Sequence, residues 1–599
     1  MDMIEKRLGI IIALSTLLFA CSETIDNNQL KQQSIDKANS IYAKYFLEAK
    51  EFDPITPTFI GERDFNGKFI PEISDQNTEK RQAFEAKYIA LIKTVDKDLL
   101  KGQDLLSYDI FLQARETDLA GFRFPFELTP IDQMNGLHLL IAQLGSGQSA
   151  QPFNNVEDYD LFLQRADGFI KWLESAQLSM QRGIEVGVVH PEIVIQKLLP
   201  QFKYHMVENV QESLFAQPII NSQLSPEELA EVKGKYLTFI GDKLIPAFTK
   251  MHDFLLNDYL PATRSEVGLS SQPDGKAWYQ HMIKVYTTLD LEPKEIHELG
   301  KQEVQRILDE MNMVRETVGF TGDLPAFFEH LRTSDEYYFK STQELVDAYD
   351  QVRVKINNAT PKLFDLFPKA DYKVKLTEDF RAASSAGAEY REPSADGSRQ
   401  GIFYINGYNL KAQPKFLMET LSIHEASPGH HFQVSIQQEL TDLPEFRRFG
   451  NYSVFSEGWA LYAESLGKEL GLFTDPMMWY GRLSDEQLRA MRLVVDTGLH
   501  AMGWTREQAI QYMLNNSSMN ETDVIAEVER YIVMPGQALG YKIGEFKIRA
   551  LRNKAEAALG KQFDIKSFHR EILKDGALPL PLLEQKVNRW IKTHSMPSS

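Results

Sequence analysis

The sequence predicts a mainly α-helical protein with a small β-sheet. Helical periodicity dominates its 599 residues, strand-like stretches are few, and no repeat of about 20–50 residues indicates a solenoid. The clearest helix covers 293–314, where Pro293 and the acidic residues after it are typical of a helix N-terminus and an apolar stripe follows. Similar helical runs cover 225–256, 341–358, 483–502 and 543–558.

A small sheet is predicted near residues 370–406, and its clearest strand is 401–406. This strand follows a loop rich in glycine, serine and proline and precedes another helix. A turn-rich stretch indicates a weak boundary near 275–290. We therefore expect an N-terminal helical region over 36–280 and a region over 281–599 that carries the chemistry, the two forming one continuous fold.

The charge of the chain excludes some partners. The formal net charge is −19, from 65 basic and 84 acidic residues. A field of that sign repels phosphate backbones and anionic lipid, so we expect no nucleic-acid binding and no electrostatic docking on a membrane. A single cysteine also excludes an internal disulfide.

The N-terminus has the composition of a secretory signal. A basic start is followed by an apolar run that ends at Ala20 and is shorter than the about 20 residues that span a bilayer. Cys21 follows directly, which resembles a bacterial lipobox, in which this cysteine is lipidated. We expect a signal peptide over 1–20 and a polar tether over 21–35. Because Ser22 rather than aspartate comes next, the resemblance implies a lipid anchor in the bacterial cell envelope, at the outer membrane or periplasm.

The most informative segment runs from His424 to His431 and reads His-Glu-Ala-Ser-Pro-Gly-His-His. It resembles the zinc-protease pattern His-Glu-x-x-His, in which two histidines on one helix face bind the metal and the glutamate is the general base. Here Pro428 takes the place of the second histidine. In an unbroken helix His430 would lie about 9 Å along the axis from His424. That is too far for two zinc–nitrogen bonds of about 2.0–2.1 Å.

The Pro-Gly pair in this segment forbids an unbroken helix, because proline lacks a donor and glycine permits unusual dihedrals. If the pair loops out, His430 returns to His424 and Glu425 stays beside the reacting water. We therefore expect His424 and His430 to bind the metal, with His431 as the alternative second ligand.

A catalytic zinc site needs a third ligand and an open position. Glu457 is the best candidate, because it lies in an apolar helical context where an isolated carboxylate is costly unless it is paired or metal-bound. Glu464 lies seven residues later on the same face and is expected to orient a metal-bound histidine. The sequence thus predicts one Zn²⁺ ion.

Four segments, 424–431, 456–464, 494–500 and 535–541, together resemble the bacterial family known as domain of unknown function 885. That family is similar to helical gluzincin peptidases, such as the thimet oligopeptidase, angiotensin-converting enzyme and thermostable carboxypeptidase groups. The resemblance implies a large helical zincin-like fold with a small sheet beside the metal-site helix. It also implies a glutamate ligand on a downstream helix. The Pro-Gly insertion departs from the pattern of those peptidases.

The resemblance implies further site residues. Tyr541 and His500 would stabilise the oxyanion, and Asp496, four residues before His500, can fix the tautomer of its imidazole. On the same helix, Arg489 and Arg492 could clamp the terminal carboxylate of a peptide, or else form ordinary surface ion pairs.

Substrate contacts are also expected around the predicted sheet. In similar metallopeptidases an edge strand before the metal helix pairs with the substrate backbone, which here implies residues 402–406, including Tyr404. Arg391, Asp396 and Arg399 in the preceding loop are expected to line the cleft.

These features predict a zinc-dependent hydrolase, and specifically a metallopeptidase that uses a metal-activated water with Glu425 as the general base. A different class is a non-catalytic peptide- or glycan-binding surface lipoprotein on a metalloprotease-like scaffold. A third option is a metal hydrolase that acts on a non-peptide amide or ester.

Overall fold

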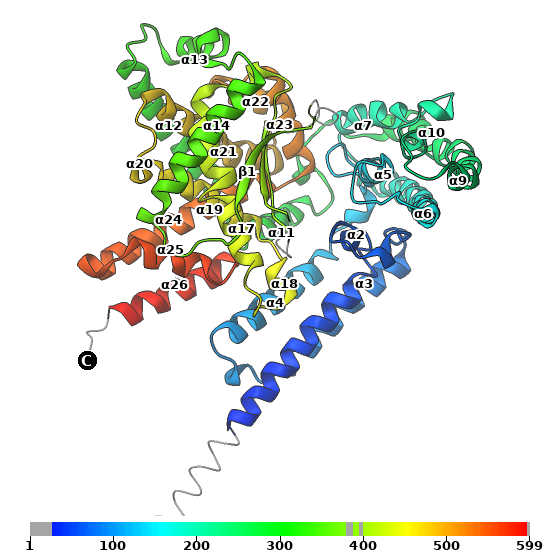
Figure 1. Cartoon of the computed structure of the whole chain (residues 1–599), viewed down its shortest axis with the longest axis horizontal. Coiled ribbons are helices and arrows are strands. Elements are labelled where there is room, and N and C mark those ends of the chain that lie inside the picture. Colours follow the sequence, from blue (N-terminus) through cyan, green and yellow to red (C-terminus); the bar gives the residue numbers. More distant parts are fainter. Residues whose placement is uncertain (1–26, 379–381, 383–386, 395–398, 596–599) are drawn as a thin grey trace, which may run out of the picture.

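The computed structural model describes residues 27–595 except 379–381, 383–386 and 395–398, and it shows a mainly helical protein with one small sheet (Figure 1). The predicted signal peptide, the lipidation residue Cys21 and the cleft residue Asp396 lie outside the described residues. No helix within the described ranges is both long enough and apolar enough to cross a membrane.

The N-terminal region is entirely helical in its regular structure. Residues 27–49 form a helix that packs with α3 and α4 into an elongated arm with its own buried cluster, which includes Tyr42, Tyr88 and Phe111 (Figure 1). The further helices of this region are α2 (Thr56–Phe59), α3 (Asp75–Ile92), α4 (Gln103–Gly121), α5 (Leu137–Gly145), α6 (Val156–Val186), α7 (Glu192–Tyr204), α8 (Gln217–Ile220), α9 (Pro226–Phe239), α10 (Ile245–Phe254) and α11 (Gly275–Thr287).

The C-terminal region contains the sheet and the helices that surround it. The helices predicted at 293–314, 341–358, 483–502 and 543–558 are confirmed as α12, α14, α21 and α24. The first three begin with a proline in the first turn or a side-chain cap. The helices are α12 (Pro293–Thr317), α13 (Leu324–Thr333), α14 (Thr342–Ala359), α16 (Met418–Leu421), α17 (His430–Gln438), α18 (Glu445–Arg448), α19 (Ser453–Ser465), α20 (Gly467–Leu470), α21 (Pro476–Ala501), α22 (Arg506–Asn515), α23 (Glu521–Val533), α24 (Gly540–Leu559), α25 (Ile565–Leu573) and α26 (Leu580–His594).

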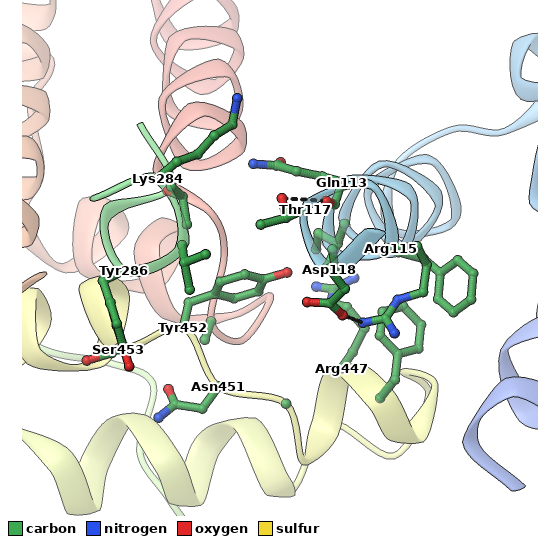
Figure 2. A pocket seen from close by; sticks show the side chains of 18 of the residues that line it. Gln113, Arg115, Thr117, Asp118, Lys284, Tyr286, Arg447, Asn451, Tyr452 and Ser453 are labelled. Carbon is green, nitrogen blue, oxygen red and sulfur yellow. Dashed lines mark hydrogen bonds and ion pairs between the residues drawn. The ribbon is translucent and has the colours of Figure 1, made fainter. Parts of the chain in front are cut away.

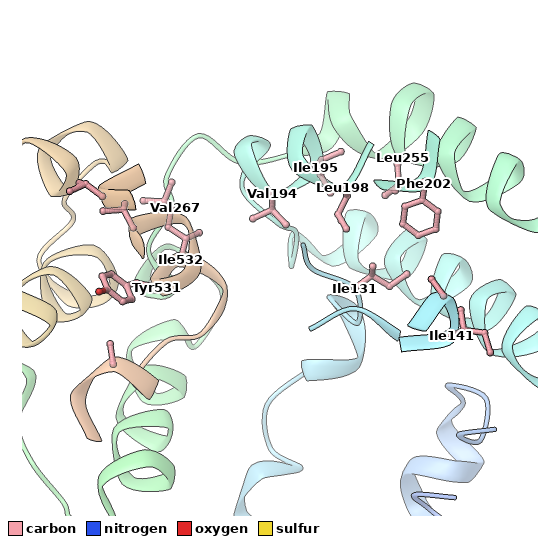
Figure 3. Close-up of a cluster of buried hydrophobic side chains, with 14 of the residues drawn as sticks. Ile131, Ile141, Val194, Ile195, Leu198, Phe202, Leu255, Val267, Tyr531 and Ile532 are labelled. Carbon is pink, nitrogen blue, oxygen red and sulfur yellow. The ribbon is translucent and has the colours of Figure 1, made fainter. Parts of the chain in front are cut away.

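The largest buried hydrophobic cluster contains residues from both regions. Ile131, Val194 and Val267 of the N-terminal region belong to the same cluster as Tyr531 and Ile532 of the C-terminal region (Figure 3). Apolar burial on this scale resists separation of the two regions, since exposing the shared surface to water is costly.

The sheet has three strands, β1 (Tyr372–Leu376), β2 (Ala388–Arg391) and β3 (Gly401–Ile405), in the order β1-β3-β2. β3 pairs in parallel with β1 and antiparallel with β2, and all its residues are buried. The expectation that this strand is an edge is therefore wrong. Both sides of β3 are hydrogen-bonded to the chain itself, so neither it nor Tyr404, which is 4% exposed, can pair with a substrate backbone.

A close helix crossing positions the second half of the motif. A Cβ atom on Gly458 of α19 would lie 2.5 Å from the Cα atom of Gly544 of α24, and one on Gly544 would lie 2.0 Å from the carbonyl oxygen of Val454. Only glycine permits this approach, which brings the backbones of α19 and α24 into contact. As a result, Glu457 on α19 and Tyr541 on α24 come from neighbouring helices.

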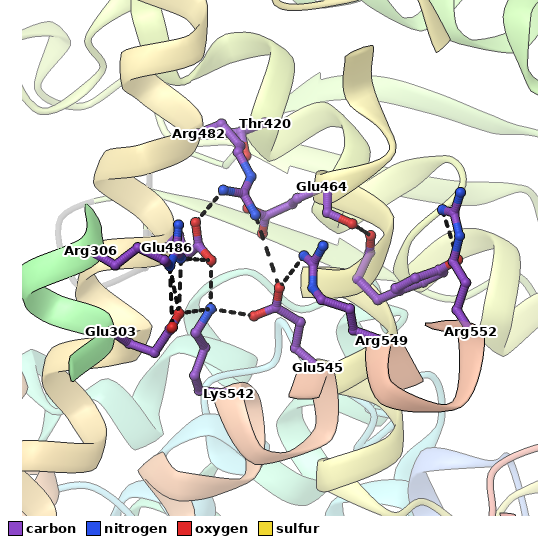
Figure 4. Close-up of polar contacts among 12 residues, drawn as sticks. Glu303, Arg306, Thr420, Glu464, Arg482, Glu486, Lys542, Glu545, Arg549 and Arg552 are labelled. Atoms are coloured by element: carbon purple, nitrogen blue, oxygen red, sulfur yellow. Dashed lines mark hydrogen bonds and ion pairs between the residues drawn. The ribbon is translucent and has the colours of Figure 1, made fainter. Parts of the chain in front are cut away.

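A buried ionic network joins α12, α21 and α24 (Figure 4). The Lys542 Nζ atom lies 2.5 Å from Glu486 Oε1, 2.6 Å from Glu545 Oε2 and 3.3 Å from Glu303 Oε2, and Arg482 also bonds Glu486. Lys542 is 1% exposed. Buried charges are tolerated only when they are paired, so the network fixes the positions of the three helices relative to one another.

Candidate metal centre

The His-Glu segment folds as a broken helix, as its proline and glycine predict. His424 and Glu425 lie in a π-helical turn (Ser422–Ala426), the chain then bends, and α17 begins at His430. Gly429 is required in the bend, because a Cβ atom there would lie 2.0 Å from the carbonyl oxygen of His424. The indole nitrogen of Trp459 donates to the carbonyl of Pro428 at 2.8 Å and anchors the bend to α19.

Three side chains converge at the bend. The rings of His424 and His430 lie 4.8 Å apart between centroids. Glu457 Oε2 lies 3.6 Å from His424 Nε2 and 3.4 Å from His430 Nε2. Donor atoms bound to one tetrahedral zinc ion at about 2.0–2.1 Å are about 3.4 Å apart, so the spacing suits a shared ion.

The state of Glu457 supports the same fit. Its Oε2 atom is buried and has no hydrogen-bond partner among the described residues. Although burial raises it, the pKa of Glu457 is held well below its usual range by His430 and His424. A buried, ionised carboxylate oxygen that faces two imidazole nitrogens without a hydrogen bond suits a shared cation, and two nitrogens with one oxygen are a common donor set of catalytic zinc.

A second carboxylate supports His424 from behind. Glu464 Oε1 lies 2.7 Å from His424 Nδ1, and Thr420 donates its hydroxyl to Glu464 Oε2 at 2.9 Å. Burial lowers the pKa of His424, but its contacts with Glu457 and Glu464 outweigh this and raise it to about 10. Glu464 therefore lies where the sequence predicted an orienting acid, and it leaves Nε2 of His424 free to face Glu457.

Removing Glu464 is expected to weaken metal binding without removing a ligand. The Glu464→Ala variant should bind zinc about 10–100-fold more weakly, because the imidazole of His424 loses the partner that fixes its orientation. Competition with a zinc chelator measures this. Glu469→Ala is the matched control, since Glu469 pairs with Arg552 at the surface of α20. Equal zinc affinity of Glu464→Ala and the unmodified protein would contradict the orienting role.

His431 lies outside the cluster. Its Nδ1 atom is 2.7 Å from the hydroxyl of Tyr390, and its ring packs 4.7 Å from that of Tyr372. Burial lowers its pKa to about 4. Of the two histidines that the sequence left as alternatives, the structure thus brings His430 to His424 and directs His431 to the sheet.

Tyr541 on α24 lies near the Glu457 carboxylate. Burial and then the Glu457 carboxylate raise the pKa of Tyr541, which places its hydroxyl within the electrostatic reach of the candidate ligand. The guanidinium of Arg492 lies 4.4 Å from the centre of its ring. A neutral phenol beside the cluster can donate a hydrogen bond to developing negative charge.

The expected roles of His500 and Asp496 are wrong. His500 accepts from the amide of Leu269 at 3.0 Å through Nδ1 and bonds the carbonyl of Tyr531 at 2.9 Å through Nε2. Asp496 accepts from the hydroxyl of Tyr279 and from the amide of Gly536. Both ring nitrogens of His500 are thus occupied by backbone groups, so it joins chain segments and has no free donor for an oxyanion.

His500 should make the fold sensitive to acid. Burial lowers its pKa from 6.5 to about 4. The unfolded chain therefore takes up a proton between these values that the folded chain does not. A stabilisation of about 3 kcal/mol is complete above pH 6.5 and is lost as the pH falls towards 4. Urea unfolding at pH 7 and pH 4 measures it: His500→Gln should lose less stability across this range than the unmodified protein. The control is His594→Gln at the exposed end of α26, and identical losses for both variants would contradict the assignment.

The two arginines predicted as a carboxylate clamp are each paired with an acid of the protein. Arg489 pairs with Asp485, and Arg492 lies 3.0 Å from Glu527. Both arginines are buried, so the alternative prediction, that they form ordinary ion pairs on the surface, is wrong. Arg391 is exposed and packs over the ring of Tyr404, and Arg399 lies in an exposed loop near Glu439, on the side of α17 that carries His431.

Asp485 is a site residue that sequence reasoning missed. Its carboxylate lies within 4.8 Å of ligand atoms of His424 and Glu464 and is also paired with Arg489. The only local signal was the i, i+4 spacing of Asp485 and Arg489, which is equally typical of an exposed helix face. Its proximity to His424 arises from the packing of α21 against α16, which no local pattern indicates.

The fold and this cluster define the class: a mainly helical protein with a His-His-Glu arrangement suited to a divalent metal. The chain belongs to the bacterial family of proteins of unknown function DUF885, whose family model matches residues 54–587. The crystal structure of "the putative lipoprotein from Colwellia psychrerythraea" is similar, with a TM-score of 0.84, 28% identity, and coverage of 94% of this chain and 99% of that one. A "putative lipoprotein of unknown function from Shewanella oneidensis" shares the fold, with a TM-score of 0.72, 18% identity and coverage of 91% and 98%. Among curated proteins, no significant match is found.

Proposed function

We propose that this protein is a zinc-dependent hydrolase, and specifically a metallopeptidase with a helical zincin-like fold. The observation that carries the proposal is the convergence of His424, His430 and Glu457 on one unsatisfied carboxylate oxygen. Two imidazoles and one carboxylate are three protein ligands, which leaves a fourth position for a reacting group.

The surrounding residues would divide the chemistry among them. A zinc ion held here would make water nucleophilic at neutral pH and polarise a carbonyl. Glu425 follows His424 in the π-helical turn and is half-buried, and it would take the proton of the attacking water and return it to the leaving group. Tyr541 would donate to the oxyanion of the tetrahedral intermediate, and Glu464 would keep His424 in its ligating orientation.

The proposed location is the bacterial cell envelope. Cys21 follows an apolar leader in the sequence, and both similar solved structures are of proteins described as a "putative lipoprotein". A lipid on Cys21 would anchor the protein, and peptides in the periplasm would be its substrates.

Zinc analysis combined with digestion of a peptide library tests the function. We expect about one zinc ion per chain and chelator-sensitive cleavage of peptide bonds. Bound zinc with no cleaved peptide would reject the peptidase and favour an ester or non-peptide amide as substrate. Absence of bound zinc after purification in the presence of the metal would reject the hydrolase altogether.

A further inference from the structure

A cavity of about 440 Å³ lies between α4, the C-terminal end of α11 and the turn that joins α18 to α19 (Figure 2). Its volume is that of a site for a small molecule or one large side chain. The rings of Phe111, Tyr286, Phe446 and Tyr452 supply much of its wall. The cavity therefore has the size and the mixed aromatic and polar lining of a small-molecule site.

The cavity adjoins the candidate metal centre. Ser453, which lines it, and Glu457 are four residues apart on α19, so they lie on the same face about 6 Å apart along the axis. The carbonyl oxygen of Tyr286 lies 3.3 Å from the position of a Cβ atom on Gly540, the residue before Tyr541. Ser453 at the cavity and Glu457 at the metal centre are thus about one helical turn apart. About two residues of an extended peptide cover that distance.

The polar groups of the cavity favour an anion. Three cations, Arg115, Lys284 and Arg447, and one acid, Asp118, line it, in a chain whose net charge is −19. Arg115 pairs with Asp118 and, outside the cavity, with Glu85. Lys284 at the rim pairs with Asp290, so the positive charge that has no acidic partner among the described residues belongs to Arg447 inside.

The surroundings of Arg447 and the start of α19 indicate which kind of anion the cavity would bind. Arg447 is 3% exposed, and its Nη atoms bond only neutral oxygens, the Ser107 hydroxyl at 2.9 Å and the Asp575 carbonyl at 2.5 Å. The Nε atoms of Arg447 and Arg115 are both buried with no hydrogen-bond partner in the described part of the chain. α19 also begins at the cavity without a side-chain cap, so its positive end faces the same space. The unpaired guanidinium of Arg447 and the uncapped helix end both suit a carboxylate.

We propose that this cavity is a specificity subsite that binds a carboxylate of the substrate, either an acidic side chain or the C-terminal carboxylate of a peptide. The inference rests on the proposed peptidase function and names the class of peptide that the metal centre would receive. The aromatic wall would contact the apolar part of the same residue.

Equilibrium binding tests this without requiring turnover. Fluorescent peptides in matched pairs, Glu against Gln at each position and a free against an amidated C-terminus, are titrated into the zinc-loaded Glu425→Gln protein. We expect one acid-bearing member to bind about ten-fold more tightly than its neutral partner. The pair that shows the difference tells a side-chain carboxylate from a terminal one.

Two variants connect the preference to the cavity. Ala114→Phe fills the cavity and Lys284→Gln removes a charge from its rim, and each should reduce the preference for the acid. The matched controls are Ala120→Phe on the exposed face of α4 and Lys276→Gln on the exposed start of α11, which should keep it.

The outcomes separate the two proposals. Equal binding of acid and neutral peptides, or an unchanged preference in Ala114→Phe, would overturn the subsite even if the protein cleaves peptides. Acid-selective binding that Ala114→Phe abolishes would support the subsite even if the unmodified protein cleaves none of the bound peptides, in which case the peptidase function alone is rejected.

Discussion

Replacing Glu457 by alanine should empty the metal centre and leave the fold intact. Two imidazoles remain in Glu457→Ala, and without the charged ligand the zinc content should fall from about one to below about a tenth of an ion per chain after dialysis. The fold should persist, because the lost Oε2 atom has no hydrogen-bond partner among the described residues. Metal analysis by mass spectrometry, together with thermal unfolding with and without a chelator, measures both effects.

Glu445→Ala is the control for this experiment, since Glu445 is exposed at the start of α18. It should keep its zinc, and a chelator should lower its unfolding temperature as in the unmodified protein. The Glu457→Ala protein should show no response to the chelator. Stoichiometric zinc in Glu457→Ala would show that this carboxylate is not a ligand.

Replacing Glu425 by glutamine should separate catalysis from metal binding. The amide cannot accept the proton of the attacking water, so turnover should fall about 10²–10⁴-fold while zinc content stays at that of the unmodified protein. Steady-state cleavage of a peptide identified from the library, measured beside zinc analysis of the same sample, tests both halves of the expectation.

Glu445→Gln makes the same chemical change at an exposed position and should leave turnover unchanged. A Glu425→Gln protein that turns over at the rate of the unmodified protein would remove Glu425 from the mechanism. A variant that loses both turnover and zinc would instead place Glu425 among the groups that hold the metal.

The break in the metal motif could be predicted because its cause is local. Pro428 cannot continue the helix, and Gly429 allows the chain to pass against the carbonyl of His424, so the return of His430 follows from the residues between them. Glu457 could be predicted for a related reason, since an isolated carboxylate among apolar helical residues needs a cation.

The errors concern contacts between distant segments. The spacing of Asp496 and His500 correctly indicates one helix face, but Tyr279 and the amide of Gly536 take the carboxylate, and the backbone at Leu269 takes the imidazole. The position of β3 between β1 and β2 likewise depends on pairing partners that its own pattern does not specify.

The ionic network of Figure 4 limits how this part of the protein can change over time. Losing Lys542 alone would leave the buried Glu545 Oε2 atom without the donor that bonds it at 2.6 Å, although Glu486 keeps Arg482 and Arg306 as partners and Glu545 keeps Arg549. A replacement of Lys542 is therefore best tolerated together with a change at Glu545, so the helices beneath the candidate metal centre should drift more readily by linked double substitutions than by single ones.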